Sequence, residues 1–169
     1  NEPISILDMC TGSGCLAISL AKEYINSKIV ATDISNKALE VAKKNATKLQ
    51  CAEKINFINC NLISKFEKFH IVVSNPPYLS NEDYRKISNE IRLYEPKIAL
   101  VASRKGYQNY INISKILPNI LTKKSRAFIE IGHYQAKNIV NIFKSSNINC
   151  IKIAKDIQNL DRVLILNKS

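Results

Sequence analysis

The sequence predicts one α/β domain built on a mostly parallel sheet that closes with an antiparallel pair of strands. Short runs of aliphatic and β-branched residues alternate along the chain with longer segments of helical periodicity. Strands that alternate with helices pair in parallel through right-handed crossovers. The 169 residues are enough for one substantial core and too few for two ordinary domains.

Seven segments have the pattern of strands and four the pattern of long helices. The expected strands are residues 4–9, 28–33, 55–60, 70–75, 126–131, 150–155 and 162–166. The expected helices are residues 14–24, 36–49, 107–121 and 134–145. A turn at residues 158–161 separates the last two strands, and it is short enough for an antiparallel hairpin. Because the first strand begins almost at once, we expect the sequence to be a piece of a longer protein.

Composition and charge narrow the function classes. The chain is 46% hydrophobic and poor in Gly and Pro, as globular α/β proteins are. No run approaches the roughly 18 apolar residues that span a bilayer, and no signal peptide opens the chain, so no membrane partner is expected. The net charge of +11 is a property that proteins with a nucleic-acid partner often have. A general bias of the composition toward Lys, Asn and Ile explains this charge more simply, since the lysines are scattered along the predicted helices.

The spacing of the five cysteines does not predict a metal site. They include no Cys-x-x-Cys pair, and the two histidines lie far from them in the sequence. A structural zinc site needs closely spaced ligands, so no metal is expected. An odd number of cysteines without a signal peptide favours reduced thiols in the cytoplasm.

A glycine-containing loop between the first strand and the first helix predicts a cofactor site. Gly12 and Gly14 let the backbone approach a ligand, and the helix start offers unpaired N–H groups. The loop also satisfies the G-x-G-x-x-G/A fingerprint of dinucleotide binders. Asp33, at the end of the second strand, could accept hydrogen bonds from two ribose hydroxyls. These residues alone leave NAD, S-adenosylmethionine and a plain tight turn as alternatives.

Asp8 and the corner that follows the fourth strand favour S-adenosylmethionine over NAD. An anion at Asp8 would repel a pyrophosphate, whereas it suits the ammonium group of a methionine moiety. Asn75-Pro76-Pro77-Tyr78 follows the fourth strand, at the sheet edge where open α/β sheets bind ligands. The prolines make this corner rigid and remove backbone donors, which leaves carbonyls and one side-chain amide as acceptors. Such a corner can hold a planar –NH2 group, and it points to methyl transfer to nitrogen.

The segment that leaves this corner, residues 79–106, is long and polar. We expect at most a short helix there, near residues 84–93. A connection of this length in a compact domain is usually functional, and this one starts at the corner Asn75 to Tyr78, which we call the acceptor corner. The sequence therefore predicts a lid or a substrate-binding segment.

Through these residues and several others, the chain resembles the HemK/PrmC family of protein-(glutamine-N5) methyltransferases almost from end to end. The resemblance includes the segment Ile6–Gly14, Asp33, the Asn-Pro-Pro-Tyr corner, Glu95-Pro96 with Ala99-Leu100, Glu130-Ile131-Gly132 with Gln135, and Lys155-Asp156 to Asp161-Arg162-Val163. It implies a Rossmann-like class I SAM-dependent methyltransferase with a mostly parallel seven-stranded sheet and a C-terminal antiparallel hairpin. Residues 1–169 would be the catalytic domain, without the family's helical N-terminal substrate-recognition domain.

The resemblance also implies roles for individual residues. S-adenosyl-L-methionine would be the cofactor, and a class-1 peptide chain release factor, methylated on its Gly-Gly-Gln glutamine in the cytoplasm, would be the protein partner. The implied catalytic residues are Asn75, Pro76 and Tyr78, and the implied substrate-binding residues are these with Pro77. The implied cofactor-binding residues are Asp8, Cys10, Thr11, Gly12, Gly14, Asp33, Ile34, Asn61, Leu62 and Asn75.

The sequence departs from the family pattern in three places. Cys10 replaces the first glycine of many such loops, as in the sister family that methylates a glutamine of a ribosomal protein. Asn61 stands where an aspartate near the adenine is common, and residues 103–106 are unusually basic.

Three alternatives to a release-factor enzyme remain open. The first is a ribosomal-protein glutamine methyltransferase. The second is an adenine-N6 methyltransferase acting on nucleic acid, which shares the tetrapeptide. Nucleic acid is disfavoured as the substrate because the chain has no room for a target-recognition domain and no basic groove rich in aromatic residues. The third is a binding module without activity, and the intact acceptor corner argues against it.

Overall fold

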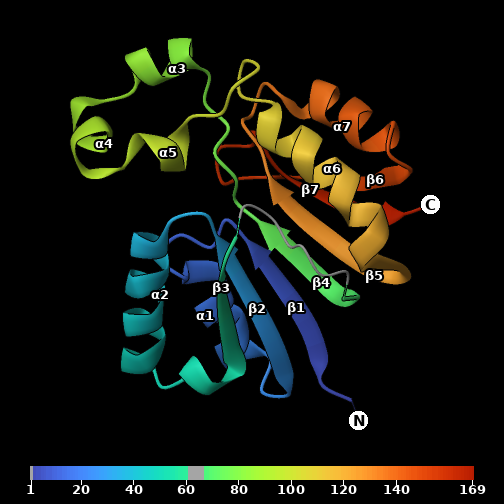
Figure 1. Ribbon diagram of the computed structural model, residues 1–169. Helices are drawn as coiled ribbons and strands as arrows, with labels where there is room; N and C mark the ends of the chain where they lie inside the picture. Colours follow the sequence, from blue (N-terminus) through green and yellow to red (C-terminus); the bar gives the residue numbers. More distant parts are fainter. Residues whose placement is uncertain (1, 61–66) are drawn as a thin grey trace.

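Seven strands form one sheet in the computed structural model, which describes residues 2–60 and 67–169 (Figure 1). The strand order is β3-β2-β1-β4-β5-β7-β6. The strands are β1 (Ile4–Met9), β2 (Ser27–Asp33), β3 (Ile55–Asn59), β4 (Phe69–Ser74), β5 (Leu121–Glu130), β6 (Ile148–Lys155) and β7 (Asp161–Lys168). The first five pair in parallel, whereas β7 is antiparallel to both β5 and β6. The predicted fold class and the C-terminal hairpin are confirmed.

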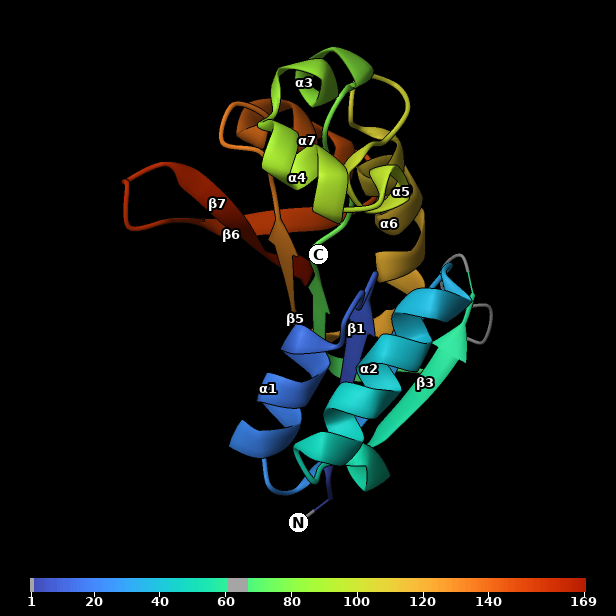
Figure 2. The same ribbon diagram turned by 90° about the vertical axis from the view of Figure 1, so that its left-hand side faces the viewer.

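The helices form layers on the two faces of the sheet and a separate group beyond its carboxyl edge (Figures 1 and 2). They are α1 (Cys15–Glu23), α2 (Asn36–Lys48), the 3-10 turn η1 (Ala52–Lys54), α3 (Asn81–Lys86), α4 (Asn89–Tyr94), α5 (Lys97–Leu100), α6 (Gln108–Ile120) and α7 (Ala136–Lys144). The four long helices that the sequence predicted are α1, α2, α6 and α7.

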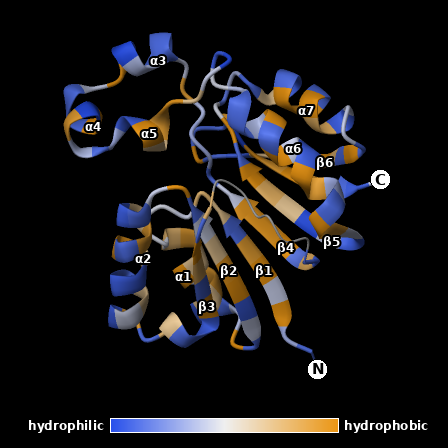
Figure 3. Cartoon of the chain, viewed as in Figure 1, coloured by the Kyte–Doolittle hydropathy of each residue, from blue (hydrophilic) through white to orange (hydrophobic). Residues whose placement is uncertain are grey.

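The core has two parts because successive strand residues face opposite sides of the sheet. On one face, Ile6 of β1 packs in a cluster with Ala17 and Ile18 of α1. On the other face, its neighbour Leu7 packs in a cluster with Leu117 of α6 and Phe143 of α7. Figure 3 shows apolar residues along the central strands and polar ones on the outer side of α2. The central strands are therefore buried between helices, as the near-continuous apolar run in β1 predicts.

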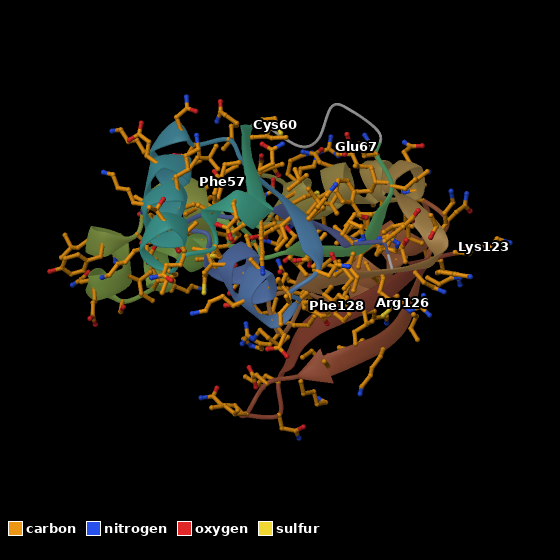
Figure 4. All side chains as sticks on the ribbon, turned by 90° about the horizontal axis from the view of Figure 1, so that it is seen from below. Phe57, Cys60, Glu67, Lys123, Arg126 and Phe128 are labelled. Carbon is orange, nitrogen blue, oxygen red and sulfur yellow. The ribbon has the colours of Figure 1, made fainter. Side chains whose placement is uncertain are left out.

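Strand β5 differs from the prediction because it begins at Leu121 and not at residue 126. Its first residues are mostly exposed and polar, so they carry no strand periodicity. Farther along, Ala127 and Ile129 are fully buried, while Arg126 and Phe128 face the other side and are only partly covered. Figure 4 labels these two side chains on the same strand, together with Lys123 near its start. The alternation that the sequence shows thus begins only where the strand enters the core.

The prediction of at most one short helix near residues 84–93 was wrong. Residues 79–106 contain three short helices, α3, α4 and α5, and we call this segment the lid. Ser80 and Ser88 are the N-caps of α3 and α4, and their side chains accept hydrogen bonds from the N–H groups of Asp83 and Ile91. The extended backbone of Ser88 divides the expected helix in two, as N-cap residues do where they start a new helix.

The two ends of the lid are hydrogen-bonded to each other, and α3 is hydrogen-bonded to the rest of the domain. Leu79 N–H donates to the carbonyl of Leu100, and Ala102 N–H donates to the carbonyl of Leu79. At α3, the Asp83 carboxylate accepts the hydroxyl of Tyr134 at 2.8 Å. Between these anchors α4 and α5 extend past the carboxyl edge of the sheet (Figure 2). The lid therefore begins and ends beside the acceptor corner and overhangs it.

Candidate active site

The glycine loop between β1 and α1 has the backbone shape of a ligand-binding turn. Cys10, Gly12 and Gly14 all have positive φ, of 59°, 57° and 84°. A Cβ added to Gly14 would lie 3.0 Å from Ala42 Cβ, which leaves too little room for a side chain. At Gly12 an added Cβ would have nothing within 4 Å. Gly14 thus allows α1 and α2 to pack closely, while Gly12 leaves open space above the loop.

Asp8 lies beneath this loop and is completely buried. Its Oδ2 accepts hydrogen bonds from the Thr11 hydroxyl at 2.6 Å and from the Ala17 N–H at 3.0 Å. Its Oδ1 has no hydrogen-bond partner within the described part of the chain. Burial raises the pKa of Asp8 from 3.8 to about 6, against the lowering effect of these two hydrogen bonds. The carboxylate joins the loop to α1 from below.

Asp33 holds the same loop from the side. Its Oδ2 accepts from the Gly12 N–H and its Oδ1 from the Ser35 N–H, both at 2.9 Å. A carboxylate oxygen can accept more than one hydrogen bond, so each keeps capacity for a ligand hydroxyl. Asp33 also lines the neighbouring cleft. A carboxylate that binds a ribose needs this position.

A cleft of about 680 Å³ lies between the glycine loop, the carboxyl ends of β2 and β3, the acceptor corner and the lid. This volume falls in the range of small-molecule sites, roughly 300–1,000 Å³. Of the predicted site residues, those that line it are Cys10, Thr11, Gly12, Asp33, Ile34, Asn75 and Pro77. Cys60, labelled in Figure 4 at the end of β3, also lines it.

The other predicted site residues lie elsewhere. Asp8 and Gly14 are beneath the loop, Pro76 is buried, and Tyr78 is half-buried outside the cleft lining. Asn61 and Leu62 lie outside the described residues. The predictions that Asp8 contacts the cofactor and that Tyr78 contacts the substrate stay predictions.

The acceptor corner, Asn75 to Tyr78, is held by side chains from two later elements. Asn109 Nδ2 of α6 donates to the Pro77 carbonyl at 2.9 Å. Gln135 Nε2 donates to the Tyr78 carbonyl at 3.2 Å, and the buried Gln135 side chain also accepts from the Gly132 N–H. Asn75 is exposed to the cleft. The backbone is thus fixed while the Asn75 amide stays accessible.

The sequence singled out only some of the residues that complete the cleft. Asn109 and Gln108 come from the start of α6, and Glu95, Pro96 and Ile98 come from the lid. Only Glu95-Pro96 had a signal, as part of the family resemblance. Asn109 had none, because its contact with Pro77 spans 32 positions of the chain.

Within residues 2–60 and 67–169, no group of three or more His, Cys, Asp or Glu side chains could hold a metal ion. In the same residues no helix is both long and apolar enough to cross a membrane.

Comparison with known proteins identifies the family. Residues 2–93 match the model of the methyltransferase small domain. The chain belongs to this family. It is 38% identical over 169 residues to a bifunctional methyltransferase of Rickettsia felis, covering 99% of this chain and 32% of that protein. It is 36% identical over 171 residues to a release factor glutamine methyltransferase of Fusobacterium nucleatum, covering 99% of this chain and 48% of that protein. The resemblance to the HemK/PrmC family is confirmed.

The fold is also that of solved methyltransferase structures. A ribosomal protein L11 methylase from Lactobacillus delbrueckii subsp. bulgaricus superposes with a TM-score of 0.72 at 18% identity, covering 99% of this chain and 71% of that chain. This similarity supports the Rossmann-like class I fold. The chain spans about a third to a half of the length of the two curated relatives above.

The family and the fold support S-adenosylmethionine as the cofactor of this methyltransferase domain, and the residues present fit it. Asp33 would hold the ribose hydroxyls, and the open space above Gly12 would admit the cofactor next to the loop backbone. Ile34, half exposed at the cleft, offers apolar surface for a base.

Replacing Asp33 by Ala should weaken S-adenosylmethionine binding about ten- to a hundredfold. The change removes a charged acceptor, and hydrogen bonds to charged groups are worth about 1.5–3 kcal/mol. Glu40→Ala is the matched control, because it removes one carboxylate from exposed α2 surface outside the cleft. Titration calorimetry measures the S-adenosylmethionine affinity of both variants. Equal affinities in the two variants would contradict the role of Asp33.

Asp8 should make the free energy of unfolding depend on pH. A folded pKa above the unfolded one contributes stability that is fully present below about pH 4 and is lost as the pH rises through about 6. Relative to Asp8→Asn, the natural chain should therefore lose about 3 kcal/mol between pH 4 and pH 8. Urea unfolding of both proteins across this range gives the difference. A difference that does not vary with pH would show that Asp8 titrates normally.

Proposed function

We propose that this chain transfers a methyl group from S-adenosylmethionine to the side-chain amide nitrogen of a protein glutamine. The observation that carries the proposal is that Asn75 and the glycine loop line one cleft. Parallel pairing of β1 with β4 sets their spacing, since Met9 lies opposite Ser74. The site therefore combines a cofactor loop with a fixed acceptor for an –NH2 group.

The corner explains how an unreactive amide could be methylated. An amide nitrogen is a poor nucleophile because its lone pair is delocalised into the carbonyl. If Asn75 Oδ1 and the Pro76 carbonyl accept its two N–H groups, they orient the nitrogen toward the cofactor. Such orientation is worth up to about 7–11 kcal/mol in favourable systems. The same acceptors stabilise positive charge that develops on nitrogen. When bound, S-adenosylmethionine supplies a methyl group on a positively charged sulfur.

This mechanism needs no histidine or cysteine as a base. No histidine is among the described residues that line the cleft. Burial raises the pKa of the Cys10 thiol to about 12, so the thiol stays protonated at neutral pH. The proton released from the methylated nitrogen can pass to water, since the positive charge makes it acidic.

The Gly-Gly-Gln glutamine of a class-1 peptide chain release factor is the substrate we propose. It is supported by the similarity to proteins named as release factor glutamine methyltransferases and by the acceptor corner. The reaction would take place in the cytoplasm, where the five cysteine thiols would remain reduced.

Methyl transfer from labelled S-adenosylmethionine tests the proposal, with a release factor, a ribosomal protein and DNA assayed side by side. We expect label in the release factor, on the glutamine located by peptide mass analysis. Label only in the ribosomal protein would change the substrate within the same chemistry. Label only in DNA, or in none of the three, would overturn glutamine methylation.

Asn75→Ala should lower kcat roughly 100-fold with little change in S-adenosylmethionine affinity. It removes one preorganised group at the reacting nitrogen, a loss that costs about this much in other active sites. Asn75→Asp should also be slow, because its new charge must be desolvated and it cannot donate a hydrogen bond. Asn141→Ala, on the exposed surface of α7, is the control. Single-turnover rates at saturating cofactor decide, and a normal rate for Asn75→Ala would rule out its role.

A further inference from the structure

The turn between β6 and β7 is built around one carboxylate. Asp156 Oδ1 accepts from the N–H groups of Gln158 at 2.9 Å and Leu160 at 3.0 Å. Its Oδ2 accepts from Nε and Nη2 of Arg162, at 3.2 and 3.0 Å. The turn therefore fixes the Arg162 guanidinium with a two-pronged contact, which a lysine could not reproduce. None of these residues lines the cleft.

The same guanidinium reaches back to the sheet and to the acceptor corner. Its Nη1 donates to the Ile131 carbonyl at 3.4 Å, and Ile131 N–H donates to the Arg162 carbonyl at 2.9 Å. The Tyr78 side chain lies at the same place, since a Cβ added to Gly132, the residue after Ile131, would lie 3.4 Å from its ring. The guanidinium is close enough to the Tyr78 hydroxyl to lower its pKa in part, although burial raises that pKa overall. Arg162 thus joins the hairpin, the end of β5 and the corner.

Tyr78 is consequently held at three points, all outside the cleft. Gln135 binds its carbonyl, and its ring packs against the buried core cluster that contains Tyr110 and Ile131. The Arg162 guanidinium lies beside its hydroxyl. The side chain is an anchor for the backbone that carries Asn75 to the cleft.

We infer that Arg162 is a positioning residue for methyl transfer: it fixes Tyr78, and through Tyr78 it fixes the orientation of the acceptor corner. This inference rests on the proposed function for its effect on rate, but the contact itself can be tested separately. Orientation matters because a displacement of about 1 Å at the reacting groups can cost about 100-fold in rate. The C-terminal hairpin is therefore coupled to the active site without contacting it.

The kinetic test compares Arg162→Met, Arg162→Lys and the control Lys155→Met. Lys155 lies on the same hairpin and pairs with Asp161 at 3.1 Å, but it has no contact with the corner among the described residues. Arg162→Met should lower kcat about 10- to 100-fold, with unchanged S-adenosylmethionine affinity. Arg162→Lys should recover part of the loss, and Lys155→Met should keep the normal kcat. Equal kcat in all four proteins would overturn the inference.

A double-mutant cycle tests whether Arg162 acts through Tyr78. Tyr78→Phe removes only the hydroxyl that Arg162 contacts, so Arg162→Met should cost clearly less in the Tyr78→Phe background than in the natural chain. Fully additive losses would contradict the inference. If Arg162→Met does not fold, as urea unfolding would show, the same cycle with Arg162→Lys decides.

An NMR measurement tests the contact between Arg162 and Tyr78 without any substrate. In Arg162→Met the pKa of the Tyr78 hydroxyl should rise further, because a positive partner is lost. The amide signals of Asn75, Tyr78 and Leu79 should shift or broaden, whereas in Lys155→Met they should not. Unchanged signals in Arg162→Met would overturn the inference even in an active enzyme. If the natural chain methylates no glutamine, the proposed function fails, and these signals still decide whether Arg162 holds the corner.

Discussion

The parallel pairing of β1 with β4 is the constraint on which the site depends. Met9 lies opposite Ser74, and the Ser74 hydroxyl donates to the Met9 carbonyl at 2.8 Å where both strands end. The glycine loop leaves directly from one strand and the acceptor corner from the other. A shift in this register would move the two loops apart and turn buried residues outward. Methyl donor and acceptor can meet because two adjacent strands end at the same level.

Two carboxylates then shape the cofactor loop in different ways. Asp8 binds Thr11 and Ala17 from below and is isolated from water, whereas Asp33 binds Gly12 at the cleft and remains partly exposed. Burial of Asp8 with one unpaired oxygen opposes its ionisation, which its raised pKa reflects. The loop therefore costs stability at neutral pH, as functional loops often do. On the acceptor side, the corner is neutral and is held by the amides of Asn109 and Gln135.

Local patterns predicted most of the fold and the central part of the site. Strand and helix periodicity, the glycine loop, Asp33 and the Asn-Pro-Pro-Tyr corner are all readable from neighbouring residues. The missed features depend on contacts between distant positions or on single caps. Ser88 splits the lid helix, Asn109 reaches Pro77 across 32 positions, and Arg162 meets Tyr78 only after the hairpin has folded onto β5. The complete burial of Asp8 follows from packing on both faces of β1, which its own sequence neighbourhood does not reveal.

The most direct test is a crystal structure of the chain with S-adenosylhomocysteine and a peptide that contains Gly-Gly-Gln. We predict that the glutamine amide nitrogen lies about 3 Å from both Asn75 Oδ1 and the Pro76 carbonyl oxygen. We also predict that a ribose hydroxyl of the cofactor product lies within the same distance of Asp33. A glutamine bound away from the corner, with the cofactor product in the cleft, would contradict the proposed role of the corner.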